Sequence, residues 1–404
     1  MNINTDPKKI DALLDRGVEQ IFPNREFLEA RLKEGKRLSL YVGVDPTASD
    51  LHIGHGIFLR KMAQFQELGH KIILLIGDFT GMIGDPSDKS ATRVRLTHEQ
   101  VLANAQTYRE QASKIISFEG ENPAELKYNS EWLGKMSFTD VVELSAHFTV
   151  QQMLSRDMFK KRLQEDKEIY LHEFLYPLMQ GYDCVAMDVD GELGGNDQMF
   201  NMLAGRTLMK AMKNKEKFVL TTKLLVDPTG KKMGKSEGNM IRLNDSADEM
   251  FGKVMSWTDG MIVGGFELMT DVSMEDVVAI SKSLIREEVN PRDVKAQLAR
   301  EVVKQFFRDG EALAASERFD QLFKEHEIPE DIPEYKINVS QSVIDILVMS
   351  KLAPSKSEAR RLIDGDGVKM DGVVVSDGMQ LVEPTVKGVL IQKGKRHFVR
   401  VKSG

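Results

Sequence analysis

The stretch RLSLYVGVDPTASDLHIGHGIFLRKMAQFQELGHKIILLIGDF, residues 37–79, decides the fold of this chain. Residues 38–45 are strand-like, and a helix-like run follows from about residue 53 to 68. The next run, beginning at His70, is short, continuously apolar and bounded by polar residues, which is typical of a strand buried on both faces of a parallel sheet. Strand, helix and strand in this order predict a right-handed βαβ unit.

The rest of the chain extends this pattern. Helical periodicity is predicted in residues 1–36, 97–116 and 137–164, and another strand in residues 217–226. Alternation of this kind favours an α/β fold with a Rossmann-like, doubly wound parallel sheet. Ligands of such sheets bind at the carboxyl ends of the strands.

In the second half of the chain the sequence pattern no longer predicts alternating strands and helices. From about Ser246 the pattern is helical, with a capping residue at Ser273 and a helix opened by Asn290-Pro291. The stretch HEIPEDIPEYK is rich in proline and acids and indicates a linker. We expect an α/β domain over 1–240, an all-helical domain over 241–325, a linker over 326–339 and a small α+β domain over 340–404.

Composition narrows the function classes. The chain has 404 residues with 41% hydrophobic and 29% charged content, which is typical of a globular protein. One cysteine excludes an intrachain disulfide and a multi-cysteine zinc site. The N-terminus lacks the apolar core of a signal peptide, and no stretch approaches the length of a membrane span, so we expect a cytoplasmic protein without membrane contact.

The histidine pair in LHIGHGIF, His52 and His55, is a candidate phosphate site. The first N–H groups of a helix point outward unpaired and attract anions. Gly54 between the histidines lets a flat ligand approach the backbone. The alternative is that one histidine caps the helix and the other lies on the surface, and the pair alone does not decide between these.

Two more stretches are candidates for ligand binding. DPTGKKMGKSEGN, residues 227–239, combines three glycines with three lysines and could swing onto a polyphosphate, although it could also be a solvated basic loop. In EFLYPLMQGYD, residues 173–183, Tyr176, Gln180 and Asp183 lie on one face of a predicted helix. They could line a pocket or form a solvent-facing stripe. A glycine-rich turn, GGNDQ, is expected at residues 194–198.

Together the motifs HIGH at 52–55 and KMGKS at 232–236 resemble the class I aminoacyl-tRNA synthetases. The second departs from the common KMSKS at Gly234, which leaves both lysines in place. With YVGVDPT at 41–47, IGDPS at 83–87 and the pocket stretches above, the order and spacing from about Leu38 to Asn239 are similar to the bacterial tyrosyl-tRNA synthetases.

This resemblance implies a role for each matching residue. Tyr41 and Asp183 would hold the substrate's phenolic hydroxyl. The remaining tyrosine contacts would be Asp85, Tyr176 and Gln180 at the ammonium group, Gln198 near the carboxylate, and Asn129 near the pocket. The adenylate would contact Gly43, Asp45, Gly54, Asp197 and Met233, and also Lys235. The catalytic groups around the pyrophosphate and nucleotide would be Thr47, His52, His55, Lys89, Arg93, Lys232 and Lys235.

The tail is similar to the small RNA-binding domain first seen in the ribosomal protein called S-four. Residues 340–404 contain 11 Lys and Arg against 7 Asp and Glu, so they carry +4 while the whole chain carries −7. SKSEARR, from Ser355, opens a basic helix that a serine caps, and VLIQKGKRHFVRV predicts a hairpin with a glycine turn. The expected phosphate contacts are Lys356, Arg360, Arg361, Lys393, Lys395 and Arg396.

The function implied is tyrosine–tRNA ligation: tyrosine and ATP form tyrosyl-adenylate and pyrophosphate, and tyrosine passes to the 3′ end of tRNA(Tyr). Mg²⁺ is expected to arrive with ATP, and the sequence predicts no dedicated metal site and no other cofactor. The family also implies a homodimer with its interface around residues 135–159. The rivals are the tryptophan-specific relative, a smaller nucleotidyl transferase, and a non-catalytic synthetase copy that binds RNA.

Overall fold

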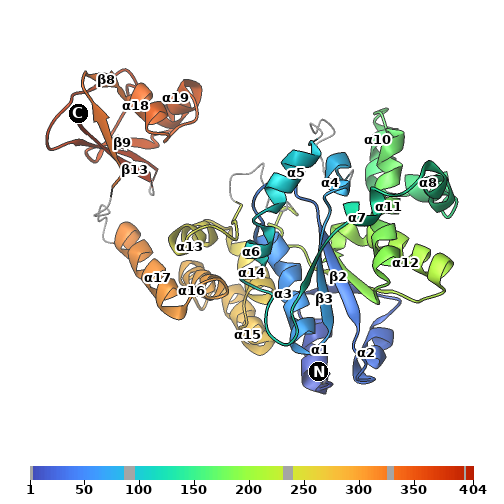
Figure 1. Cartoon of the computed structure of the whole chain (residues 1–404). Helices are drawn as coiled ribbons and strands as arrows, with labels where there is room; N and C mark the ends of the chain where they lie inside the picture. The colour runs from blue at the N-terminus through green and yellow to red at the C-terminus, as the bar shows by residue number, and fades with distance from the viewer. Residues whose placement is uncertain (1–2, 86–95, 231–239, 325–331, 395–396) are drawn as a thin grey trace. The chain divides into compact units, whose positions relative to one another are not determined.

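The computed structural model of the chain describes residues 3–85, 96–230, 240–324, 332–394 and 397–404 (Figure 1). The chain divides into two compact units, Met1–Leu313 and Ala314–Gly404. Lys89, Arg93, Lys232, Met233, Lys235, Lys395 and Arg396 fall outside the described residues.

The first unit is built on a six-stranded sheet in the order β1-β6-β5-β2-β3-β4. Its strands are β1 (Val18–Phe22), β2 (Ser39–Val44), β3 (Lys71–Ile76), β4 (Glu125–Tyr128), β5 (Gly191–Gly195) and β6 (Phe218–Thr222). Only the edge pair β1–β6 is antiparallel in the described sheet. The chain runs from β2 to one side, through β3 and β4, and later returns to the other side as β5 and β6. The order therefore reverses between β2 and β5, where doubly wound folds open their ligand crevice.

Helices cover both faces of this sheet (Figure 1). They are α1 (Pro7–Asp15), α2 (Arg25–Lys33), α3 (Ile53–Glu67), α4 (Thr80–Ile83), α5 (His98–Ala105), α6 (Tyr108–Ala112), α7 (Ser130–Leu133), α8 (Phe138–Ser145), α9 (Val150–Leu154), α10 (Asp157–Gln164), α11 (Leu171–Met187), η1 (Asn196–Gln198) and α12 (Met199–Lys213). Successive side chains of β2 point to opposite faces of the sheet and so belong to two different hydrophobic cores. Leu40, Val42 and Val44 pack with residues of α1, α2 and α3, whereas Tyr41 packs toward residues of α11 and α12.

A helical region follows the sheet, as expected. It comprises α13 (Ala247–Met255), η3 (Asp259–Met261), α14 (Ile262–Met269), α15 (Met274–Ile285), α16 (Pro291–Lys304) and α17 (Asp309–Lys324). Ser273 caps α15 by accepting from Asp276 N, and Asn290 caps α16 with Pro291 in its first turn. Both helix starts are confirmed.

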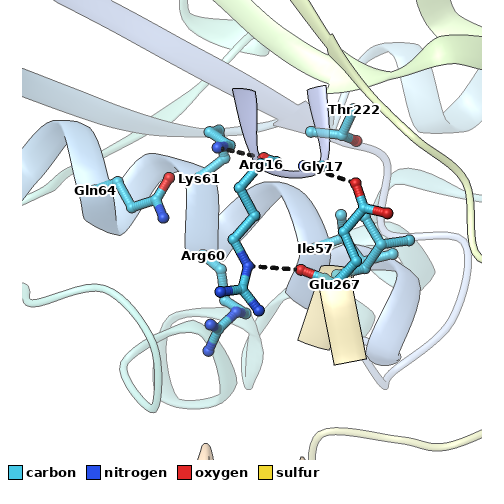
Figure 2. Close-up of a pocket in the computed structure, with 9 residues that line it drawn as sticks. Arg16, Gly17, Ile57, Arg60, Lys61, Gln64, Thr222 and Glu267 are labelled. Carbon is cyan, nitrogen blue, oxygen red and sulfur yellow. Dashed lines mark hydrogen bonds between the residues drawn. The ribbon is translucent and has the colours of Figure 1, made fainter. Parts of the chain in front are cut away.

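A small pocket marks where α14 meets the sheet domain (Figure 2). Arg16 donates to the backbone oxygens of Phe266, Glu267, Thr270 and Val272, which lie in the last turn of α14 and just beyond it. The last carbonyl oxygens of a helix lack backbone partners within it, so one guanidinium closes this helix end. No predicted site residue lines this pocket, and we assign it a structural role.

The second unit contains a five-stranded sheet in the order β10-β9-β12-β13-β7 and a two-stranded sheet, β11-β8. Its elements are β7 (Glu334–Ile337), β8 (Gln341–Ser342), α18 (Val343–Met349), α19 (Lys356–Asp364), β9 (Val368–Met370), β10 (Val373–Val374), β11 (Leu381–Val382), β12 (Val389–Lys393) and β13 (His397–Ser403). The predicted hairpin is confirmed, because β12 pairs antiparallel with β13. Ser355 caps α19 by accepting from Glu358 N at 3.3 Å.

Several sequence-based expectations need correction. The sequence predicts a helix that runs through Val18–Phe22, but α1 ends at Asp15, Arg16 is extended and Gly17 has φ +66°. Val18–Phe22 then pairs with β6 as a strand. Glu334–Ile337 falls in the predicted linker but pairs in parallel with β13. Gly194 and Gly195 fall in the predicted turn but end β5.

The long helical predictions are also too coarse. Residues 97–116 form α5 and α6, and residues 137–164 form α8, α9 and α10. The strand expected over 217–226 ends at Thr222, and the sequence patterns do not predict β4. Among the residues that the structure describes, none of the helices is long and apolar enough to cross a membrane.

Candidate functional site

The predicted site residues gather at the carboxyl ends of the parallel strands. Asp45 follows β2, Asn129 follows β4, and Gln198 follows β5 by way of η1. Helix α11 adds Tyr176, Gln180 and Asp183. Tyr176 and Asp183 are buried, so α11 does not turn them to solvent, and the interpretation of the three as a solvent-facing stripe is wrong.

Asp45 is held by two hydroxyl groups. Tyr176 donates its hydroxyl to Asp45 Oδ2 at 2.8 Å, and Thr80 donates to Oδ1 at 2.7 Å. Burial and the charge of Asp45 raise the pKa of Tyr176 well above its usual value, so this phenol stays protonated and donating. These hydrogen bonds tie the end of β2 to the middle of α11 and to Thr80 at the start of α4.

Asp183 is the buried carboxylate of the site, with 2% of its surface exposed. Its Oδ1 accepts from Trp132 Nε1 at 2.8 Å, and its Oδ2 accepts from Asn129 Nδ2 at 3.3 Å. Burial raises the pKa of Asp183 well above its usual value, and the two donors act in the opposite direction. Both partners only donate here, so the position is built to offer an acceptor to one further donor.

Tyr41 and Gln180 meet beside that carboxylate. Tyr41 is fully buried, and its hydroxyl donates to the backbone oxygen of Gln180 at 3.5 Å. Burial and the charge of Glu192 raise its pKa well above the usual value. The side chain of Gln180 donates from Nε2 to Glu192 Oε1 at 3.1 Å, so the amide of Gln180 is oriented by a residue on β5.

Asp85 and Gln198 form a second polar contact of the site. Gln198 Nε2 donates to Asp85 Oδ2 at 2.7 Å, and Gln198 Oε1 accepts from Asn201 at 2.9 Å. Arg156, which lies between α9 and α10, approaches Asp85 at 3.8 Å. Its guanidinium also lies 4.9 Å from the ring centroid of Phe200, so the Asp85 charge is balanced from the buried side.

The two histidines cap α3 reciprocally. His52 Nδ1 accepts from Gly54 N at 3.1 Å, and His55 Nδ1 accepts from His52 N at 3.0 Å. The alternative interpretation is therefore confirmed for the cap but wrong for the second histidine, because His55 also caps the helix and is half-buried. An imidazole that accepts at Nδ1 carries its hydrogen on Nε2 when neutral, so both rings present an N–H donor, and capping does not exclude a phosphate role.

Other predicted nucleotide contacts surround this helix start. Thr47 follows Asp45 in a tight turn, with Thr47 N donating to Asp45 O at 2.7 Å. A side chain at Gly43 would meet open space, so a ligand can approach the backbone there. Asp197 lies in η1 beside Gly195, where an added Cβ would lie 2.5 Å from its Oδ1. A Cβ at Gly54 would lie 2.9 Å from the His52 ring.

The predicted RNA contacts of the second unit lie mostly on its surface. Arg360 and Arg361 are exposed on α19, and Lys356 at its start pairs with Asp345 at 2.7 Å. Lys393 donates to the backbone oxygen of Leu352 at 2.7 Å. Lys393 thus also has a structural partner, which its sequence context did not indicate.

Sequence reasoning missed several residues of the site: Thr80, Trp132, Arg156, Glu192 and Lys217. Trp132 stands in the NSEW stretch that drew attention only to Asn129. Glu192 and Lys217 stand in charged stretches that precede or enter apolar strands, so the sequence does not show that both side chains are buried, and nothing in it pairs them. The described part of the chain contains no group of three or more metal-ligating side chains.

Comparison with known proteins agrees with this geometry. Residues 33–324 match the family model of class I tRNA synthetases (W and Y). Residues 324–401 match the model described as "Tyrosine--tRNA ligase SYY-like C-terminal domain". The tyrosine--tRNA ligase of Moorella thermoacetica is 45% identical over 96% of this chain and 94% of its own length. That of Thermotoga maritima is 43% identical over 98% of both chains.

Solved structures show the same fold. A C-terminally truncated mitochondrial tyrosyl-tRNA synthetase of Aspergillus nidulans superposes with a TM-score of 0.64 at 23% identity, covering 78% of this chain and 94% of that one. The Archaeoglobus fulgidus enzyme complexed with L-tyrosine gives a TM-score of 0.60 at 19% identity, covering 77% of this chain and 99% of that one.

Proposed function

The chain belongs to the tyrosine–tRNA ligases, within the class I tRNA synthetases, and from this membership we propose how its residues activate tyrosine. The enzyme joins L-tyrosine to ATP as tyrosyl-adenylate, releases pyrophosphate, and transfers tyrosine to the 3′ end of tRNA(Tyr). ATP enters as its Mg²⁺ complex, in which phosphates and water hold the ion. Tyrosine, ATP and tRNA are substrates, and no resident cofactor takes part.

We infer that the enzyme selects tyrosine through Asp183, and the burial and hydrogen bonding of this carboxylate are the main support for the proposal. Its carboxylate is buried and receives only donors, Trp132 and Asn129, so it can accept the phenolic hydroxyl of the substrate. Tyr41 forms the adjoining wall. Bound phenylalanine would leave the buried carboxylate without this hydrogen-bond donor, so binding of phenylalanine is disfavoured. Tyrosyl-tRNA synthetases are the established example of selection through a substrate hydroxyl without editing.

The other end of the amino acid is an ammonium and a carboxylate. Tyr176 and Gln180 on α11, with Asp85, would accept the ammonium protons, and Gln198 reaches the carboxylate. The contacts of Tyr176 with Asp45 and of Gln198 with Asp85 support this division. They keep four polar groups in place before the substrate arrives, which lowers the entropic cost of aligning it.

Catalysis then needs no side-chain nucleophile. The substrate carboxylate attacks the α-phosphate, and the site positions the two and stabilises developing charge. Cys184, the single cysteine, is buried, and burial raises the pKa of its thiol to about 12. His52 and Thr47 would contact the departing pyrophosphate and His55 the nucleotide, because the Nε2–H groups of both rings donate. Gly43, Asp45, Gly54 and Asp197 would hold the adenylate.

The predicted cations Lys89, Arg93, Lys232 and Lys235, with Met233, complete the nucleotide site in this proposal. In the second unit, Lys356, Arg360, Arg361, Lys393, Lys395 and Arg396 contact tRNA phosphates. The domain scheme stays a proposal, with the catalytic part over 1–240 and the RNA-binding part extended to begin at β7, before the expected residue 340. The cytoplasm is the proposed compartment, since tRNA charging serves protein synthesis.

We also propose a homodimer through the region of residues 135–159. Phe138, Val142 and Val150 are large apolar side chains exposed by 84%, 55% and 64% in the single chain. Phe138 and Val142 are four residues apart on α8, and Val150 begins α9, the next helix along the chain. Large apolar side chains exposed in this way favour an interface. Sedimentation of the protein at micromolar concentration should show a dimer, and Phe138→Glu should shift it to a monomer. A stable wild-type monomer would contradict the proposed interface.

ATP–pyrophosphate exchange with each amino acid in turn tests the function. We expect exchange with tyrosine alone at low substrate concentration, which would exclude a tryptophan enzyme and a non-catalytic copy. Charging of tRNA(Tyr) would then exclude a small nucleotidyl transferase. Exchange that required tryptophan, or no exchange with any amino acid, would refute the proposal.

A further inference from the structure

We propose that the buried pair Lys217–Glu192 is a positioning unit of the amino-acid pocket, which fixes the side-chain amide of Gln180 so that its oxygen faces the ammonium group of the substrate. This inference rests on the proposed function, in which Gln180 receives that ammonium. Neither member of the pair needs to touch the substrate. Both lie behind the pocket, on the two neighbouring strands β5 and β6 or directly before them.

The pair is almost completely buried. Lys217 has 0% and Glu192 has 2% of its surface exposed. They form a salt bridge, and Lys217 Nζ also donates to Met202 O at 3.2 Å. A buried ion pair is commonly replaced by apolar residues of similar volume without loss of stability. A role in the neighbouring pocket explains its presence better than a role in folding.

The chemistry of the contacts fixes the orientation of the amide. A carboxylate only accepts hydrogen bonds, and one oxygen of Glu192 is held by Lys217. Its other oxygen accepts from Gln180 Nε2 at 3.1 Å. The amide oxygen of Gln180 is therefore turned away from Glu192. An ammonium group only donates, so an oxygen presented to it binds and an NH₂ group presented to it repels.

The same lysine also lies near the ring of Tyr41. Its Nζ lies 5.8 Å from the ring centroid of Tyr41, a cation–π distance. The hydroxyl of Tyr41 reaches the backbone oxygen of Gln180. Lys217 thus contacts both residues that hydrogen-bond to Gln180, namely Glu192 at its side chain and Tyr41 at its backbone.

Two glycines leave room for the side chain of Lys217. A Cβ at Gly205 would lie 2.6 Å from Lys217 Nζ, and a Cβ at Gly181 would lie 3.0 Å from Gly205 N. Helices α11 and α12 therefore approach closely at two glycines, and the lysine head group occupies the space beside them. The ammonium of Lys217 also balances the charge of Glu192, which a buried carboxylate requires.

Glu192→Gln tests the proposal because glutamine keeps the volume but can donate as well as accept. The amide of Gln180 is then free to turn, and its oxygen is no longer reserved for the substrate. We expect KM for tyrosine in ATP–pyrophosphate exchange to rise about tenfold, the lower range for a hydrogen bond to a charged group. KM for ATP at saturating tyrosine should change less than twofold. A general structural defect would instead raise KM for both substrates.

A double-mutant cycle shows whether Glu192 acts through Gln180. In a Gln180→Leu background, Glu192→Gln should change KM for tyrosine less than twofold, because the amide to be oriented is gone. The same multiplicative rise in both backgrounds would overturn the proposal. So would an unchanged KM for tyrosine, or an equal rise of KM for ATP, in the Glu192→Gln single variant.

Two further variants separate positioning from folding. Lys217→Met with Glu192→Leu removes both charges together, so it should keep its melting temperature within a few degrees yet show the raised KM for tyrosine. Lys295→Met is the matched control, since Lys295 is also buried but donates to Trp257 O at 2.6 Å in the helical region. It should leave KM for tyrosine unchanged. A wild type without tyrosine-dependent exchange would instead refute the proposed function, and this inference with it.

Discussion

Replacing Asp183 by asparagine should reduce the preference of the site for tyrosine over phenylalanine, while the shape of the side chain stays almost unchanged. The carboxylate lies between Trp132 Nε1 at 2.8 Å and Asn129 Nδ2 at 3.3 Å. Asn129 cannot turn its amide to adapt, because its Oδ1 accepts from Phe79 N at 2.9 Å. In Asp183→Asn the new oxygen can keep the Trp132 bond, and the new NH₂ group then faces the donor of Asn129.

The size of the effect follows from the bond that the substrate loses. A hydrogen bond to a charged group contributes about 1.5–3 kcal/mol, so kcat/KM for tyrosine should fall by about 10- to 150-fold. Phenylalanine has no hydroxyl and never used this bond, so its kcat/KM should change much less. The preference for tyrosine over phenylalanine should therefore fall by nearly the same factor as the activity with tyrosine.

ATP–pyrophosphate exchange with each of the two amino acids measures this ratio. Trp132→Phe is the matched control, since it removes one donor to Asp183 and leaves the carboxylate in place. It should lower kcat/KM for tyrosine in the same sense but by a smaller factor. Equal losses with tyrosine and phenylalanine in Asp183→Asn would refute the reasoning and make Asp183 a structural residue.

The other predictions concern the histidines and the second unit. His52→Asn keeps a capping side chain, whereas His52→Ala loses the cap, which should cost about 1 kcal/mol of stability. If His52 binds pyrophosphate, both should slow adenylate formation alike and leave tyrosine binding without ATP unchanged, and a large loss of tyrosine affinity would overturn the assignment. Burial lowers the pKa of His70 from 6.5 to about 4, so the unfolded chain binds more protons between these values. The free energy of unfolding should thus decrease by about 3 kcal/mol as pH falls from 6.5 to 4, and a His70→Asn variant that showed the same decrease in chemical denaturation would exclude this histidine as the cause. Deleting residues 340–404 should preserve tyrosine-dependent exchange and sharply reduce tRNA charging, with a weaker salt dependence of tRNA binding. Loss of exchange on truncation would place this unit in the catalytic core.

Local patterns in the sequence predicted much of the fold because they depend on neighbours along the chain. The βαβ unit of residues 37–79 is confirmed as β2, α3 and β3. The caps at Ser273 and Ser355 and the helix start at Asn290-Pro291 are confirmed for the same reason, since these signals act within three residues of the helix. The predictions failed where partners are distant, as at Val18–Phe22, which becomes a strand only by pairing with β6.

The candidate site divides in the same way. Family motifs brought Tyr41, Asp183 and the histidine pair to attention from the sequence alone. The sequence also determined the charge contrast between the tail and the rest of the chain, since composition needs no coordinates.

Only the tertiary structure decided which groups hold these residues. Trp132 reaches Asp183, and Lys217 reaches Glu192, through strand order and through the close crossing of α11 and α12. The physical reason is that a buried charge must have a partner, and the sequence does not show which residue that partner is. Sheet order and helix packing choose the partner, and they place Glu192 against Gln180, where one carboxylate decides which atom of an amide faces the substrate.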